Sequence, residues 1–146
     1  MATDKGGGEL VLTVAPGTRL KCGDSHAQNM VIAGVEGQLR DANRYSPSRV
    51  ITADATPTTY VFEAYCTDFE KDNPSAGTAF SLGKVDPVLA CILQQSSSTV
   101  VKQAAVWIHT DNASFSHVNE KFAVSRADWD AATAIVLECV KSSRNH

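Results

Sequence analysis

Long apolar runs and an excess of basic side chains are both missing from this chain of 146 residues. No apolar stretch approaches the length that crosses a bilayer, so the sequence predicts no membrane insertion. Lys and Arg number 13 against 16 Asp and Glu, which gives a formal net charge of −3. A nucleic-acid partner is therefore not expected, because such domains usually carry a basic patch or stripe. No secretory signal pattern is visible in residues 1–8.

Cysteine is scarce, and its spacing excludes the common zinc patterns. No two of the four cysteines lie close enough in sequence for a zinc knuckle: Cys22, Cys66, Cys91 and Cys139. We therefore expect no metal site and no cofactor. Four cysteines could form two disulfides in three connectivities. Cys91 and Cys139 lie in apolar helix-like stretches, where we expect small buried core residues.

The acidic residues Asp68, Glu70 and Asp72 alternate in a polar stretch, which raises the question of a calcium loop. An EF-hand loop needs Gly at its sixth position and Glu at its twelfth. Counted from Asp68, those positions hold Asn73 and Ala79. A solvated acidic loop is the better interpretation.

The composition, 43% hydrophobic and 20% charged, is ordinary for a globular protein. We expect a disordered segment over residues 1–8, one domain over residues 9–142 and a tail over residues 143–146. Alternating and β-branched residues predict short strands in the N-terminal half, with Pro16-Gly17 closing a hairpin between the first two. Residues 34–37 are expected to form a turn and residues 41–48 a loop. The expected strands cover residues 10–15, 18–22, 29–33, 38–40, 49–53 and 59–66.

Helix signals begin at Asp86-Pro87, where Asp is a suitable N-cap and Pro suits the first turn. This helix is expected to reach about residue 95, and Ser96–Ser98 should cap a second helix over residues 99–110. Residues 112–124 are expected to be a loop, and Ser125 should cap a last helix over residues 126–141. The sequence therefore predicts an α+β fold, with an antiparallel β-sandwich or small barrel followed by a helical subdomain.

Cys66 ends the strongest predicted strand. Side chains alternate along a strand, so Val61, Glu63 and Tyr65 face one way and Cys66 faces the other with Phe62 and Ala64. We expect the face with Cys66 to be the core face.

Gln103 lies on the apolar stripe of the second predicted helix, together with Val100, Ala104 and Trp107. A buried Gln must be hydrogen-bonded or be used chemically, and a Gln bonded to backbone is the simpler alternative. A thiol and a carboxamide held together in a dry pocket can condense with loss of ammonia. Cys66 and Gln103 could then form an internal thioester.

Two separated motifs, Tyr65-Cys66 and the segment Gln103–Trp107, give the chain a family resemblance. They are similar to the paired motifs of the thioester domains of bacterial surface adhesins, the Thr-Gln-x-Ala type. Asn73-Pro74 between them is also similar to the family. Lys102 stands where Thr usually precedes the Gln, and Thr67 follows Cys66 where an apolar residue is commoner.

The resemblance implies that Cys66 and Gln103 carry a thioester in a pocket shaped by Tyr65, Ala104 and Trp107. Such a bond captures an amine covalently, from a lysine or a polyamine on a partner. It reacts once, so the protein is not expected to be an enzyme. The resemblance also implies a cell-surface or extracellular location, and we expect a monomer.

Two other functions remain open from the residues alone. The same fold could be a non-covalent binding module that lacks the bond. Alternatively, Cys66 could serve a cysteine hydrolase with His109 and Asp111, because catalytic groupings of this kind are recognised by geometry and not by order in the chain.

Overall fold

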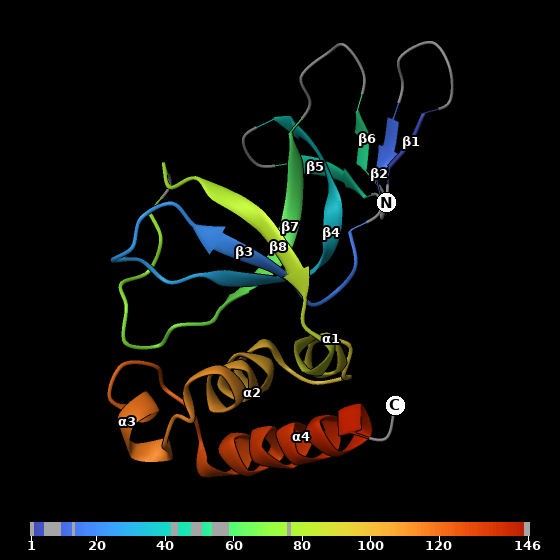
Figure 1. The fold of residues 1–146 in the computed structure, drawn as a ribbon. Helices are drawn as coiled ribbons and strands as arrows, with labels where there is room; N and C mark the ends of the chain where they lie inside the picture. Colours follow the sequence, from blue (N-terminus) through green and yellow to red (C-terminus); the bar gives the residue numbers. More distant parts are fainter. Residues whose placement is uncertain are drawn as a thin grey trace.

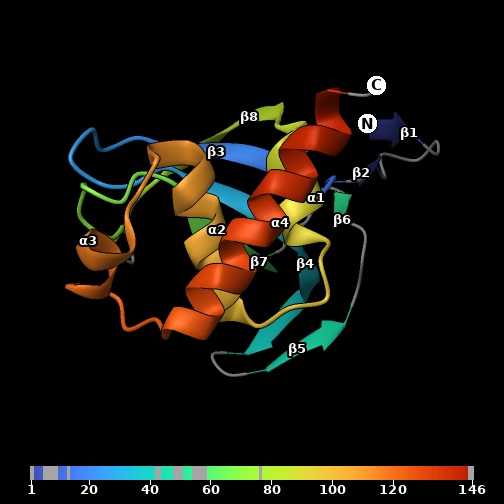
Figure 2. The same cartoon turned by 90° about the horizontal axis from the view of Figure 1, so that it is seen from below.

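The computed structural model describes residues 2–4, 10–12, 14–41, 44–47, 51–53, 59–75 and 77–144. Strands occupy the first part of the chain and helices the last, which confirms the predicted α+β class (Figure 1). The helices α1, α2 and α4 lie together on one side of the strands, and Figure 2 views the molecule from that side.

A five-stranded antiparallel sheet supports the helices. Its long middle strand β4 pairs with β7, β3 and β5, and β8 joins β3. The strands are β3 (Thr18–Cys22), β4 (Met30–Asp41), β5 (Arg44–Pro47), β7 (Tyr60–Cys66) and β8 (Phe80–Val85). A separate three-stranded sheet has β2 in the middle and consists of β1 (Ala2–Asp4), β2 (Leu10–Leu12) and β6 (Ile51–Ala53).

The predicted hairpin between β2 and β3 is wrong. Pro16 and Gly17 do form a turn, and the Thr18 N–H donates to the Ala15 carbonyl at 3.2 Å. However, β2 pairs with β1 and β6, whereas β3 pairs with β4 and β8. A local turn signal does not specify which strands pair across it.

The predicted turn at residues 34–37 is also wrong, because β4 continues without interruption. Its register against β7 shifts between Ile32 and Gly34 and again between Val35 and Gly37. The glycines therefore mark bulges that bend one long strand, which is a common role of Gly within strands.

Three further segments differ from expectation. Arg44–Pro47, inside the expected loop, forms β5, because the end of β4 offers it a pairing edge. Ala2–Asp4, inside the segment expected to be disordered, pairs with β2 as β1. β8 was not predicted, and its residues after Phe80 are exposed, Leu82 at 68%. The expected strand residues 49–50 lie outside the described residues.

The helices are α1 (Pro87–Leu93), α2 (Thr99–Asp111), α3 (Phe115–Asn119) and α4 (Arg126–Arg144). The predicted caps are confirmed: Asp86 accepts from the N–H groups of Val88 and Leu89, and Ser98 accepts from that of Val101. α3 lies within the expected loop 112–124, where Ser114 caps it. α4 runs through Arg144, so the first two residues of the tail expected over residues 143–146 belong to the helix.

The main core lies between the five-stranded sheet and the helices. Val31 and Tyr65 are cross-strand partners on β4 and β7, are 0% and 3% exposed, and belong to this core. The expected core face of β7 is therefore wrong, because Tyr65 faces inward. Cys66 still packs against the core from the end of the strand.

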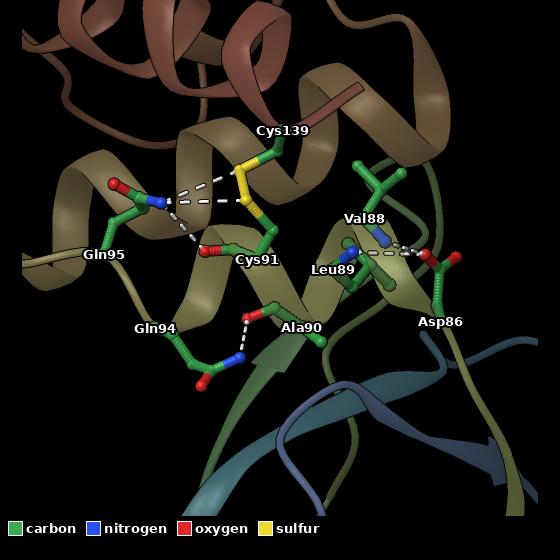
Figure 3. The surroundings of a disulfide bond; sticks show 8 residues. All are labelled: Asp86, Val88, Leu89, Ala90, Cys91, Gln94, Gln95 and Cys139. Atoms are coloured by element: carbon green, nitrogen blue, oxygen red, sulfur yellow. Dashed lines mark hydrogen bonds between the residues drawn. A yellow bond between two sulfur atoms is a disulfide. The ribbon is translucent and has the colours of Figure 1, made fainter. Parts of the chain in front are cut away.

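A disulfide joins Cys91 of α1 to Cys139 of α4, with their Cα atoms 5.7 Å apart (Figure 3). Cys139 is fully buried in the core and Cys91 packs against it, as expected, and the disulfide gives one of the pairings that the sequence left open. The Gln95 carboxamide lies beside both sulfur atoms, at 3.7 and 3.8 Å. Sequence separation hides this pair, because only the packing of α4 along α1 brings the two positions together.

Candidate functional site

Cys66 and Gln103 meet where the end of β7 lies against α2. The Gln103 Oε1 atom accepts a hydrogen bond from the Cys66 N–H at 3.0 Å. Its Nε2 atom donates to the Cys66 carbonyl at 2.8 Å. The structure therefore brings together the two residues that the sequence pairs.

The topology explains why this backbone is open to a side chain. Just after β7, the Thr67 N–H donates to the carbonyl of Asn29, the residue before β4. This bond extends the pairing of β7 with β4 by one residue. Within the described residues, β7 pairs only with β4. On the edge of β7 that faces away from β4, the Gln103 carboxamide forms the hydrogen bonds that a neighbouring strand would otherwise form. Gln103 is 8% exposed. Both of its polar ends are satisfied, as a buried amide requires.

This arrangement is the backbone-bonded Gln that the sequence allowed, and it also suits condensation. The Cys66 N–H polarises the Gln103 carbonyl in the direction that stabilises a tetrahedral oxyanion. The acyl carbon is held against the residue that carries the thiol. The same two hydrogen bonds hold the Gln103 carboxamide against the Cys66 backbone, and both residues line one cavity.

The Cys66 thiol is free and partly buried. Burial raises the pKa of this thiol, and the negative charge of Asp68 raises it further. Thiolate is the attacking form of cysteine, so its supply at neutral pH is small. Any acylation of Cys66 is consequently slow near pH 7 and speeds up as the pH rises.

A cavity of about 500 Å³ opens beside the pair. Its wall combines aromatic rings, two carboxylates, two amines and two further amides. The residues that line it are Gln28, Cys66, Phe69, Glu70, Lys71, Asp72, Asn73, Gln103, Trp107, Lys121 and Phe122.

Trp107 lines the cavity as the resemblance implies, and Gln28 holds it in place. The Trp107 Nε1–H donates to Gln28 Oε1 at 3.2 Å, and Gln28 Nε2 donates to Asn73 Oδ1 at 3.2 Å. Phe69 and Phe122 pack edge-on against the Trp107 ring, with centroids at 4.9 and 5.1 Å. Gln28 was missed by the sequence reasoning, because only its burial to 3% exposure distinguishes it from other polar loop residues.

Tyr65 and Ala104 do not line this cavity. Ala104 is fully buried in the core, and the Tyr65 hydroxyl donates to Glu63 Oε1 at 2.7 Å. Burial, followed by the neighbouring Glu63 carboxylate, raises the pKa of Tyr65 to about 12. Both residues belong to the core between the sheet and the helices.

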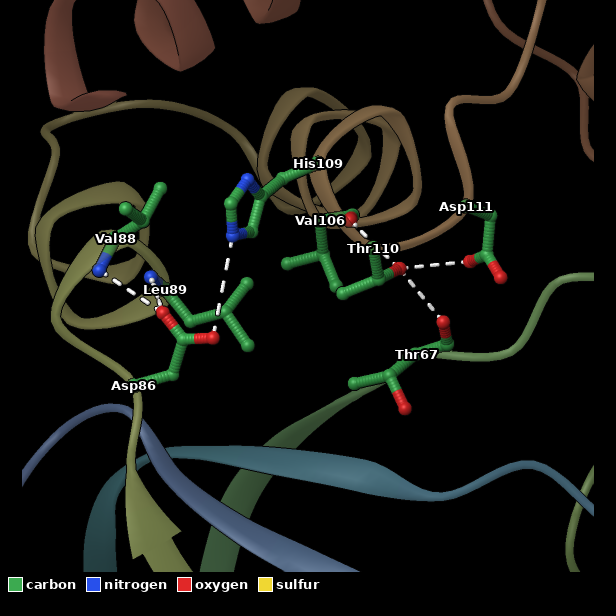
Figure 4. Close-up of polar contacts among 8 residues, drawn as sticks. All are labelled: Thr67, Asp86, Val88, Leu89, Val106, His109, Thr110 and Asp111. Atoms are coloured by element: carbon green, nitrogen blue, oxygen red, sulfur yellow. Dashed lines mark hydrogen bonds and ion pairs between the residues drawn. The ribbon is translucent and has the colours of Figure 1, made fainter. Parts of the chain in front are cut away.

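His109 and Asp111 lie elsewhere (Figure 4). His109 Nε2 is 3.9 Å from Asp86 Oδ2 at the start of α1. Asp111 Oδ2 accepts from the Thr110 hydroxyl at 2.7 Å and from the Phe69 N–H at 3.3 Å. Neither residue lines the cavity beside Cys66, so the geometry does not assemble the cysteine-hydrolase grouping.

Comparison with protein-family models, with curated proteins and with solved structures finds no match. In the described ranges, no group of three or more His, Cys, Asp or Glu side chains could hold a metal ion. No helix among those residues is long and apolar enough to span a bilayer.

Proposed function

We propose that this chain is a surface-adhesion domain in which Cys66 and Gln103 form an internal thioester that captures an amine on a partner. The observation that carries the proposal is the pair of hydrogen bonds between the Gln103 carboxamide and the Cys66 backbone. A carboxamide buried against one particular cysteine is the arrangement that condensation needs.

The first step forms the thioester. Cys66 Sγ attacks Gln103 Cδ, the C–S bond forms and the C–N bond breaks. The thiol proton leaves with the amide nitrogen as ammonia. The Cys66 N–H, which donates to Gln103 Oε1, stabilises the negative charge that develops on this oxygen.

The second step is capture. A primary amine attacks Gln103 Cδ, a C–N bond forms and the C–S bond breaks, and Cys66 recovers its thiol proton. The product is a secondary amide on Gln103 that does not turn over, so the protein acts once. Neither step needs an oxidant or a cofactor.

The cavity wall supports an amine as the incoming group. Two carboxylates supply negative charge beside the two lysine amines of the wall, and three aromatic rings offer their faces. Ammonium groups are attracted to carboxylates and to aromatic faces. A lysine or polyamine on another surface fits this chemistry.

The disulfide supports an extracellular or cell-surface location. Cys91 and Cys139 are joined, and disulfides persist in oxidising environments and are rare in the cytosol.

Labelling with a biotin-linked primary amine tests the function. We expect the native chain to become labelled covalently, and both Cys66→Ala and Gln103→Glu to lose the label. Without the thiol no thioester forms, and a carboxylate is not an acyl donor towards a thiol without activation. The measurement is streptavidin blotting after denaturation, followed by peptide mapping to Gln103.

Two matched variants serve as controls for that experiment. Cys22→Ala removes the other free cysteine, and Gln94→Glu alters an exposed glutamine of the helical region. Both should label like the native chain. Labelling of Cys66→Ala or Gln103→Glu at the native level would contradict the Cys66–Gln103 pairing.

The alternative is a non-covalent binding module that uses the same cavity. It is favoured by the raised pKa of Cys66, which leaves little thiolate to attack Gln103. A native chain that takes up no amine and retains an alkylatable Cys66 would support this alternative.

A further inference from the structure

Lys121 brings an amine of the chain itself into the cavity of Cys66 and Gln103. Its residue lines that cavity, and its Nζ atom lies 5.3 Å from the centroid of the Phe69 ring. This distance is within the range of a cation–π contact, which holds the lysine head against the cavity wall.

Packing ties Lys121 to the helix that carries Gln103. The Phe69 ring lies edge-on to Trp107, and Phe122, the residue after Lys121, lies edge-on to Trp107 from another side. Trp107 follows Gln103 by four residues on α2, so the two side chains lie on one face of the helix. Lys121 therefore lines the same cavity as the acyl donor and is linked to its helix through aromatic contacts.

Lys71 also lines the cavity, but its situation differs. Among the described residues a cation–π contact is found for Lys121 and not for Lys71. The two lysines consequently form a matched pair: both reach the same cavity, and one is anchored on its wall.

We propose that Lys121 is the internal acceptor of the Gln103 acyl group, which closes an isopeptide bond between α2 and the segment after α3. The proposal rests on the proposed function, since the thioester supplies the activated acyl group. Lys121 Nζ attacks Gln103 Cδ, a C–N bond forms and the C–S bond breaks. The proton lost by the amine goes to Cys66 Sγ, so the net change is loss of one ammonia from Gln103 and Lys121.

The internal reaction competes with capture of an external amine. A chain that meets a partner early is coupled to it, and a chain that does not is closed on Lys121 and no longer reacts. The isopeptide and the thioester have the same mass, but only the thioester takes up methylamine and only the isopeptide leaves Cys66 free.

The test is peptide mapping of the native full-length chain after prolonged incubation, alkylation and acid quenching, compared with Lys121→Arg and Lys71→Arg. Arg keeps the cation over Phe69 and removes the nucleophilic amine. We expect a crosslinked peptide that joins Gln103 to Lys121 in the native chain and in Lys71→Arg. We expect its complete loss, with persistent methylamine uptake, in Lys121→Arg.

The two proposals fail in different ways. A native chain that stays light by one ammonia, takes up methylamine after incubation and shows no Gln103–Lys121 peptide would overturn the internal acceptor and leave the thioester standing. A crosslink that survives in Lys121→Arg would also overturn it. A chain with neither ammonia loss nor amine uptake would overturn the thioester itself, and the internal acceptor with it.

Discussion

Gln103→Leu is expected to lower the free energy of unfolding by about 2–6 kcal/mol when it is made in a Cys66→Ala chain. Leu fills similar space but leaves the Cys66 N–H and carbonyl without their partners. An unsatisfied buried polar group costs about 1–3 kcal/mol, and two are left here. The Cys66→Ala background removes any thioester, so urea denaturation of the two chains reports the hydrogen bonds alone.

Lys102→Leu in the same background is the matched control, since Lys102 is adjacent on α2 and lies off the apolar stripe. It should change stability far less. Equal effects of the two substitutions would mean that the Gln103 hydrogen bonds do not stabilise the end of β7.

Gln103→Glu adds a pH signature to this prediction. A carboxylate cannot donate to the Cys66 carbonyl, whereas the neutral acid can, so the folded state should raise the pKa of this carboxyl group. A group with a raised folded pKa stabilises the protein below its unfolded pKa, about 4.3 for Glu, and this stability is lost as the pH rises. The deficit of Gln103→Glu relative to Gln103 should therefore shrink on acidification, and a deficit independent of pH would argue against donation to that carbonyl.

Loss of the disulfide is the second large effect. The bond closes a sequence separation of 48 residues, for which the chain-entropy model gives about 4 kcal/mol of stabilisation. The double variant Cys91→Ala/Cys139→Ala should therefore lose about 2–5 kcal/mol of unfolding free energy. The bond links α1 to α4, and both helices share the main core with α2. The loss of stability should therefore extend to the helical region as a whole.

A reducing agent provides the control for that prediction. It should destabilise the native chain by about the same amount and leave the double variant unchanged. Equal stability of the native chain with and without reductant, with the bond shown to be reduced, would contradict a structural role for the disulfide.

The helices could be predicted well because their signals are local. Asp86, Ser98 and Ser125 each precede a helix and cap it, as the sequence indicated. The strand pairing could not be predicted, because pairing depends on residues far apart in the chain. β4 pairs with three of the other four strands of the sheet, and its register against β7 shifts at Gly34 and Gly37. Neither feature is visible in a short window of sequence.

The site was predicted only in part, because only some of its residues are marked by a local sequence signal. Gln103 stood out because a polar residue on an apolar helical stripe is visible locally, and Cys66 stood out at the end of a strong strand. Gln28 and Lys121 did not stand out, because nothing near them in sequence reveals that they line the same cavity. The disulfide partners were likewise hidden by the long separation between them.

The intact mass of the denatured chain, with and without methylamine treatment of the native protein, tests the thioester most directly. After allowance for the disulfide, the thioester predicts a mass lower than that of the sequence by one ammonia. After methylamine treatment it predicts the sequence mass plus one methylene group. A mass equal to that of the sequence, with both Cys22 and Cys66 open to alkylation after denaturation and no change with methylamine, would contradict the bond.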